Sequence, residues 1–180
     1  AAFDKARPIQ ASAIVSGRDL GGKGEDVTSP ADRSRVIGTV AEASMDAIDK
    51  AFAAAAKAQG EWDRRGGAER GAILRDMADA LEGETDRLLA LMAREAGKTL
   101  PDGVAEVREA VDFLRYYAAE AEQKFAAPDR LPGPAGETNH LGLKGRGTIV
   151  CISPWNFPLA IFTGQVSAAL AAGNTVLAKP

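Results

Sequence analysis

Residues 147–153 read Gly-Thr-Ile-Val-Cys-Ile-Ser, and residues 174–178 read Asn-Thr-Val-Leu-Ala. The first stretch is a nearly continuous apolar run with the length of a strand, which is typical of a strand buried on both faces in a parallel sheet. Residues 158–172 are rich in alanine and predict a buried helix, with Gly173 at its C-terminal cap. The order strand, helix, strand predicts a β-α-β unit and an α/β fold.

The turn at residues 153–157 lies at the carboxyl end of the first predicted strand. A right-handed crossover of this kind begins an open nucleotide-binding sheet, where ligands lie beyond the carboxyl ends of the strands. No Gly-x-Gly-x-x-Gly follows the strand, so the usual dinucleotide cradle is missing. Gly97-Lys98-Thr99 is similar to the end of a phosphate loop, but that motif needs a glycine where this chain has Met92.

Four amphipathic helices are predicted before this unit. Ser44 caps the first, and two more are expected between the Gly66-Gly67 break and Gly97. The fourth, over residues 104–125, has apolar side chains at alternating steps of three and four. This stripe is also compatible with a coiled coil, but it lasts only about three heptads, which favours packing against the body of the domain.

Shorter elements are predicted in the rest of the chain. Residues 27–40 predict a hairpin with a turn near Pro30. Residues 1–26 have no sustained period and are expected to be a linker or mobile leading segment. Residues 128–136 contain three prolines and two glycines and predict a loop, and residues 138–143 predict a strand.

Composition and charge exclude several classes of function. The 180 residues are 46% hydrophobic and 26% charged, and no apolar run approaches the roughly 20 residues needed to span a membrane. The net charge is −3 without a basic stripe, which excludes nucleic acid as a partner. The chain has one cysteine and one histidine, too few for an intramolecular disulfide or for a zinc site built from several Cys or His ligands. The first residues lack a secretory signal, so we expect a cytoplasmic protein.

The turn hexapeptide Ser-Pro-Trp-Asn-Phe-Pro at residues 153–158 resembles a specific motif of the aldehyde dehydrogenase superfamily. The resemblance extends through residues 171–180 and back through residues 94–99, and it covers residues 27–180. It implies an α/β, aldehyde dehydrogenase-like fold, of which this chain holds the helix-rich N-terminal part of a Rossmann-type NAD-binding domain with the first β-α-β unit. Residues 106–117 and 151–162 are most similar to the dehydrogenase half of bifunctional proline utilization A (PutA).

The resemblance also implies roles for the turn residues. In the family a cysteine thiolate attacks the aldehyde, an asparagine amide and a backbone N–H hold the oxyanion, hydride passes to NAD, and a glutamate activates water. Asn156 matches the oxyanion asparagine, although an asparagine in a turn commonly satisfies only its own backbone. The matched cofactor-binding positions are Ile152, Ser153, Pro154, Trp155 and Lys179, the last of which binds the adenosine ribose.

Two further positions match substrate contacts of the semialdehyde subfamily. Glu109 matches a glutamate near the substrate's ammonium group, and Phe157 matches an aromatic side chain against its aliphatic stem. A carboxylate is the natural partner of an ammonium group. Most glutamates on a helix surface are merely solvated, which is the alternative for Glu109.

Cys151 is not expected to be the nucleophile. It lies in a buried apolar run, where desolvation raises the pKa of a thiol and disfavours the reactive thiolate. In the family the nucleophile, the activating glutamate and the pyrophosphate-contacting segment lie further along the chain than Pro180. The isolated chain, without the catalytic domain, is therefore expected to be inactive.

The resemblance implies a parent enzyme that oxidises L-glutamate γ-semialdehyde to glutamate with NAD in proline catabolism. FAD is expected only if a proline dehydrogenase domain is fused upstream. The alternatives are a general aldehyde dehydrogenase with another substrate and a non-catalytic module for NAD binding or assembly. The expected partners are the aldehyde, the remainder of the parent chain and a second copy, since residues 138–146 match a strand pair that extends toward a partner subunit.

Overall fold

The segment from residue 148 to residue 179 folds as a β-α-β unit. In the computed structural model, which describes residues 8–180, strand β8 (Thr148–Ile152) is followed by helix α5 (Ala160–Ala171) and strand β9 (Thr175–Lys179). The two strands pair in parallel along their full length. Gly173 follows the helix with a φ of 83°, a conformation that glycine adopts without strain. The predicted β-α-β unit and the α/β class are confirmed.

One face of β8 is open, although its apolar sequence predicts burial on both faces. Cys151 is only 4% exposed, whereas Val150 and Ile152 on the opposite face are 49% and 65% exposed. Helix α1 (Met45–Arg64) reaches this part of the sheet beside the first residue of β9, where the Thr175 hydroxyl donates to the Ala55 carbonyl (3.0 Å). The prediction of two buried faces is wrong for the described residues, because apolar composition does not state how far a covering helix extends.

The remaining helices are α2 (Gly66–Gly83), α3 (Thr85–Glu95) and α4 (Leu100–Lys124). They confirm the predicted elements, and α4 begins before the predicted residue 104. Ser44 caps α1 by accepting a hydrogen bond from the Ala47 amide (3.2 Å), and Gly97, with a φ of 66°, follows the end of α3. The four predicted helices are confirmed. Within residues 8–180, every helix is too short or too polar to cross a membrane.

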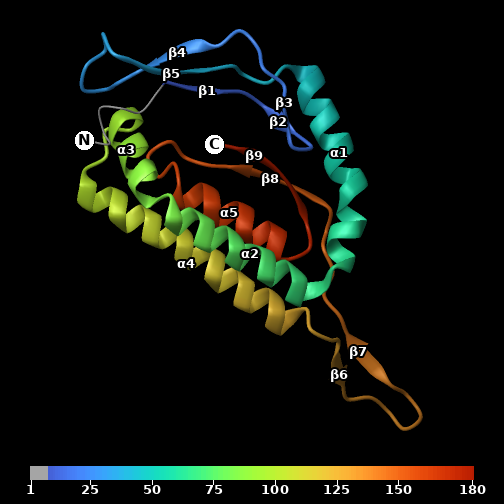
Figure 1. The fold of residues 1–180 in the computed structure, drawn as a ribbon. Helices are drawn as coiled ribbons and strands as arrows, with labels where there is room; N and C mark the ends of the chain where they lie inside the picture. Colours follow the sequence, from blue (N-terminus) through green and yellow to red (C-terminus); the bar gives the residue numbers. More distant parts are fainter. Residues whose placement is uncertain (1–7) are drawn as a thin grey trace.

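Helices α2 and α4 lie side by side, and α5 packs against them (Figure 1). The close approach of α2 to α4 needs glycine at Gly67, because a Cβ there would lie 2.0 Å from the Ala121 carbonyl oxygen. All three helices contribute buried side chains to the core: Leu74, Ala78, Val111, Leu114, Ala118, Ala121 and Ala171. The apolar stripe of α4 therefore packs against the body of the protein and not in a coiled coil.

Residues 8–40 form short strands. They are β1 (Ile9–Ala11), β2 (Ile14–Val15), β3 (Arg18–Asp19), β4 (Glu25–Thr28) and β5 (Val36–Val40). The antiparallel pairing of β4 with β5 confirms the predicted hairpin, and β1 pairs with β5 in parallel. The expected linker thus contains strands over residues 8–26, and its first residues, 1–7, lie outside the described part. Strands of two or three residues are too short to show a period, so the sequence pattern missed them.

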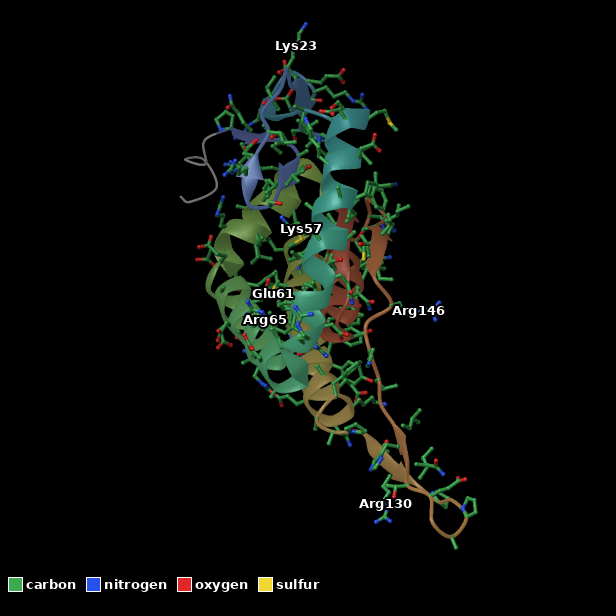
Figure 2. The ribbon with its side chains drawn as sticks, turned by 90° about the vertical axis from the view of Figure 1, so that its right-hand side faces the viewer. Lys23, Lys57, Glu61, Arg65, Arg130 and Arg146 are labelled. Carbon is green, nitrogen blue, oxygen red and sulfur yellow. The ribbon has the colours of Figure 1, made fainter. Side chains whose placement is uncertain are left out.

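An antiparallel hairpin projects from the body beyond the end of α4 (Figure 1). It consists of β6 (Asp129–Leu131) and β7 (Asn139–Leu141), and Figure 2 places Arg130 on this arm. Strand β7 confirms the strand predicted within residues 138–143. Strand β6 lies in the segment for which three prolines predict a loop; it fits between Pro128 and Pro132, where no proline interrupts it.

Candidate functional site

The turn between β8 and α5 is anchored at its first residue. The Ser153 amide donates to the Lys179 carbonyl of β9 (3.0 Å), and the Ser153 hydroxyl donates to Gln165 Oε1 of α5 (3.2 Å). Ser153 is itself buried. The turn therefore starts from a position held by both a strand and a helix, and the following residues extend from the carboxyl edge of the sheet.

Asn156 lies exposed on this turn. Within residues 8–180 its side-chain amide makes no hydrogen bond to another residue, so it does not satisfy its own turn. The neighbouring Trp155 is 80% exposed. The structure thus presents a neutral amide donor at the end of a parallel strand, where it is able to bind an external oxygen atom.

The residues that match cofactor contacts lie together at the same edge. Ile152 and Lys179 are partners in the β8–β9 register, and Ser153 is hydrogen-bonded to Lys179. Ile152, Pro154, Trp155 and Lys179 are exposed. The Lys179 ammonium donates to the Pro180 carbonyl (2.7 Å). An exposed apolar surface beside a lysine, beyond the ends of two parallel strands, fits a nucleotide cofactor.

The two predicted substrate contacts lie on different elements. Phe157 is on the turn, with its ring centroid 4.1 Å from the Lys98 ammonium nitrogen. Glu109 is exposed on α4, in a surface hollow. The other residues that line this hollow are Ala105, Arg108, Asp112, Phe113, Tyr116 and Tyr117. In the described part of the chain, no hydrogen bond or ion pair joins Glu109 to the turn.

Glu106 and Lys98 contact the turn, and neither is among the residues that sequence reasoning selected. Glu106 is only 1% exposed, and its Oε1 accepts from the Leu159 amide (2.8 Å) and the Ala160 amide (3.2 Å). Its Oε2 lies 2.7 Å from the Lys98 ammonium nitrogen. The sequence feature that could have identified Glu106 is its position four residues before Ala110, which places it on the buried face of α4.

Comparison with known proteins identifies the family. The model of the aldehyde dehydrogenase family matches residues 18–180. The chain belongs to the aldehyde dehydrogenase family. The bifunctional protein PutA of Escherichia coli (strain K12) is 45% identical over 159 residues, which are 88% of this chain and 11% of that protein. The alpha-ketoglutaric semialdehyde dehydrogenase of Bacillus subtilis (strain 168) is 37% identical over 158 residues, 86% of this chain and 31% of that protein.

A solved structure agrees with this aldehyde dehydrogenase assignment. The 1-pyrroline-5-carboxylate dehydrogenase from Thermus with bound NAD is 31% identical, with a TM-score of 0.94 over 99% of this chain and 35% of that chain. The predicted aldehyde dehydrogenase-like fold and the similarity to PutA are confirmed. The chain spans between about a tenth and a third of the length of these relatives.

Cys151 is a buried side chain of this aldehyde dehydrogenase segment, on the strand that precedes the turn. Burial raises the pKa of its thiol, which keeps the thiol protonated and weakly nucleophilic. Among residues 8–180, no group of three or more His, Cys, Asp or Glu side chains is placed to hold a metal ion. What the turn does offer is the exposed side-chain amide of Asn156, which is able to donate a hydrogen bond to an external oxygen atom.

Proposed function

We propose that the protein containing this chain oxidises L-glutamate γ-semialdehyde to glutamate with NAD, in proline catabolism. In this proposal residues 27–180 are the N-terminal part of its NAD-binding domain, and the nucleophilic cysteine and the activating glutamate are supplied by residues outside this sequence. The names of the relatives support the substrate, since one is PutA and another is a 1-pyrroline-5-carboxylate dehydrogenase.

The free amide of Asn156 carries the proposal. When a nucleophile adds to an aldehyde, the carbonyl oxygen becomes negatively charged, and a donor held in place beforehand stabilises that charge. Asn156 is exposed and has no hydrogen-bond partner in residues 8–180, while Ser153 anchors the start of its turn to β9 and α5. One such donor contributes ~2.7–4 kcal/mol to lowering the barrier.

The carboxyl edge of β8 and β9 is proposed to hold NAD, which accepts the hydride when bound. Ile152 and Trp155 offer exposed apolar surface to the cofactor. Lys179, on the adjacent strand, offers an ammonium donor for ribose hydroxyls. No glycine-rich cradle is present in the turn, so this segment is proposed to bind only part of the cofactor.

Glu109 and Phe157 are proposed to recognise the substrate. The carboxylate of Glu109 stands in a hollow with aromatic walls and is able to pair with the ammonium group of glutamate semialdehyde. Phe157 follows Asn156 directly in the chain and offers an apolar surface to the aliphatic stem. Together they would orient the aldehyde toward the asparagine amide.

A second candidate is a dehydrogenase of another semialdehyde. The similarity to the Bacillus subtilis enzyme, which is named for α-ketoglutaric semialdehyde, favours it. That aldehyde carries a keto group where glutamate semialdehyde carries an ammonium group, so Glu109 would have no cation to bind. A non-catalytic module for NAD binding or assembly is the third candidate.

The first measurement is the intact mass of the natural gene product. A mass well above 18.8 kDa supports a nucleophile elsewhere in the protein, and that product is then assayed for NADH formation with both semialdehydes. Glu109→Gln is expected to lower kcat/KM about tenfold for glutamate semialdehyde and to leave aldehydes without an ammonium group unchanged.

Asp112→Asn is the matched control, because it removes a neighbouring carboxylate from the same hollow. Equal loss with both variants would contradict a specific role for Glu109. A preference for α-ketoglutaric semialdehyde would favour the second candidate. NAD binding without turnover of any aldehyde would favour the non-catalytic module.

Three further properties of the protein are part of the proposal. We expect a homodimer in which residues 138–146 contact the partner subunit, because β6 and β7 project from the body (Figure 2). Light scattering that returns a monomer would remove this expectation. FAD is proposed only for a protein with a proline dehydrogenase domain, and a cytoplasmic location stays a prediction.

A further inference from the structure

We propose that the buried ion pair between Lys98 and Glu106 is a positioning device for the turn that carries Asn156. This inference rests on the proposed function, because it concerns the same oxyanion donor. The two residues come from the segment after α3 and from α4, and both contact the segment around Asn156. Neither residue contacts Asn156 itself among the described interactions.

The Glu106 carboxylate holds the downstream end of the turn. Its Oε1 accepts hydrogen bonds from the amides of Leu159 and Ala160, at 2.8 and 3.2 Å, where α5 begins. These amides have no partner within the helix, and the positive end of the helix dipole adds to the attraction. Leu159 is three residues after Asn156, so the carboxylate determines where the end of this short turn lies.

The Lys98 ammonium holds the middle of the turn. It lies 2.7 Å from Glu106 Oε2 and 4.1 Å from the centroid of the Phe157 ring. A cation over an aromatic face is attracted by the ring, most strongly where water is excluded, and the Lys98 side chain is largely buried. Phe157 directly follows Asn156, so one ammonium group connects the turn to the carboxylate that caps α5.

A backbone hydrogen bond fixes the position of Lys98. Its amide donates to the Met92 carbonyl of α3 (3.3 Å), after the left-handed Gly97. The ammonium group therefore extends from a fixed helix end. Helices α3 and α4 also pack directly on each other. Among residues 8–180, however, the hydrogen bonds and the ring contact that join them to the segment around Asn156 come from this pair. Without the pair, the turn would keep the hydrogen bonds of Ser153 at its start.

A buried ion pair is weak evidence for stability, because desolvation offsets much of the attraction between the charges. Apolar side chains of similar size would fill the same space. What they would not provide is two hydrogen bonds to the amides of α5 together with a cation on Phe157. These directional contacts are expected where an asparagine donor must be held within a fraction of an ångström.

The opposite end of α5 provides a matched control. Arg70 is as buried as Glu106, and it donates to the Ala171 carbonyl (3.0 Å) and the Asp63 carbonyl (2.7 Å). Loss of the Glu106 carboxylate or of the Arg70 guanidinium removes a hydrogen-bond partner from backbone groups at one end of α5. Glu106 and Lys98 contact the turn and Arg70 does not, so variants of Arg70 report loss of stability without loss of positioning.

The test is a double-mutant cycle in the full-length gene product, with kcat measured from the rate of NADH formation. Glu106→Gln and Lys98→Met are each expected to lower kcat about 10- to 100-fold, as a misplacement near 1 Å does. Lys98→Arg, which keeps the charge and the contact with the ring, is expected to restore kcat to within about threefold. In the Asn156→Ala background, Glu106→Gln is expected to change kcat less than about twofold.

Arg70→Met is expected to lower the Tm at least as much as Glu106→Gln while changing kcat less than about threefold. Multiplicative effects of Glu106→Gln and Asn156→Ala, or equal loss of kcat with Arg70→Met, would overturn the inference and leave the proposed function standing. Full turnover by Asn156→Ala would overturn both. If Glu106→Gln does not fold, the same comparison is made with Lys98→Met, alone and in the Asn156→Ala background.

Discussion

The two asparagines that flank α5 have opposite environments. Asn174, after the helix, is buried; it accepts hydrogen bonds from the Arg146 and Gly147 amides (2.6 and 3.1 Å) and donates to the Ala169 carbonyl (3.2 Å). Asn156, before the helix, is exposed and makes no hydrogen bond to the described residues. The same side chain thus serves the fold at one end of a helix and is available for chemistry at the other.

The difference follows from the position of each end relative to the sheet. The end that contains Asn174 leads into β9 and lies beside the start of β8, where backbone amides need acceptors. The end that contains Asn156 lies at the carboxyl edge, where parallel strands leave space for a ligand. In the proposed function, one end of α5 therefore serves stability and the other serves catalysis.

The largest expected effect is on catalysis by Asn156→Ala. Loss of the oxyanion donor is expected to lower kcat about 10²- to 10³-fold in the full-length protein. The change should leave the Tm within about 1 °C, because the amide has no partner to lose. NADH formation and thermal unfolding measure the two quantities. Gln123→Ala, which removes an exposed amide from α4, is the control; an equal loss with that variant would contradict the oxyanion role.

Asn174→Ala is expected to have the reverse profile. It leaves the Arg146 and Gly147 amides without their acceptor. Because both hydrogen bonds are only partly buried, the expected destabilisation of the fold is about 1–3 kcal/mol in total. Denaturant unfolding measures the change, with Asn156→Ala as the matched asparagine control. Similar stabilities for the two variants would show that the comparison between the helix ends is wrong.

Gly173→Ala sharpens the comparison at the buried end of α5. Alanine at a φ of 83° is strained by about 1 kcal/mol, and its Cβ would also lie 2.2 Å from Asp63 Oδ1. The expected loss is about 1–2 kcal/mol in denaturant unfolding. Gly136→Ala shares a positive φ of 91° but would contact nothing within 4 Å, so it isolates the backbone strain. Equal losses would exclude the contact with Asp63.

The smallest expected effect concerns the Cys151 thiol, on the strand that leads to Asn156. Burial raises the pKa of this thiol, so at pH 8 a thiol reagent should label the native protein much more slowly than the urea-unfolded protein. Above the ordinary thiol pKa the unfolded state loses its proton while the folded state keeps it, so stability should fall slightly as pH rises. Cys151→Ala should remove this dependence of stability on pH. Rapid labelling of the native protein would contradict the burial of the thiol.

Local patterns predicted most of the elements because they depend on neighbours in the chain. The caps at Ser44 and Gly97, the stripe of α4 and the strand–helix–strand order can each be read from a few adjacent residues. The sequence did not predict β1, β2, β3 and β6, because two or three residues show no period and their partners lie elsewhere in the chain. The exposure of one face of β8 was not predicted, because burial of that face depends on how far α1 extends.

The sequence by itself determined the family and the turn residues that match its site, since Ser-Pro-Trp-Asn-Phe-Pro is specific and continuous. Only the tertiary structure decided what holds that turn. Glu106 and Leu159 are 53 residues apart, and their contact depends on how α4 packs against α5. A buried glutamate in an apolar stripe indicates that a partner exists, but only the packing of three distant segments identifies the partners as Lys98 and the amides of α5.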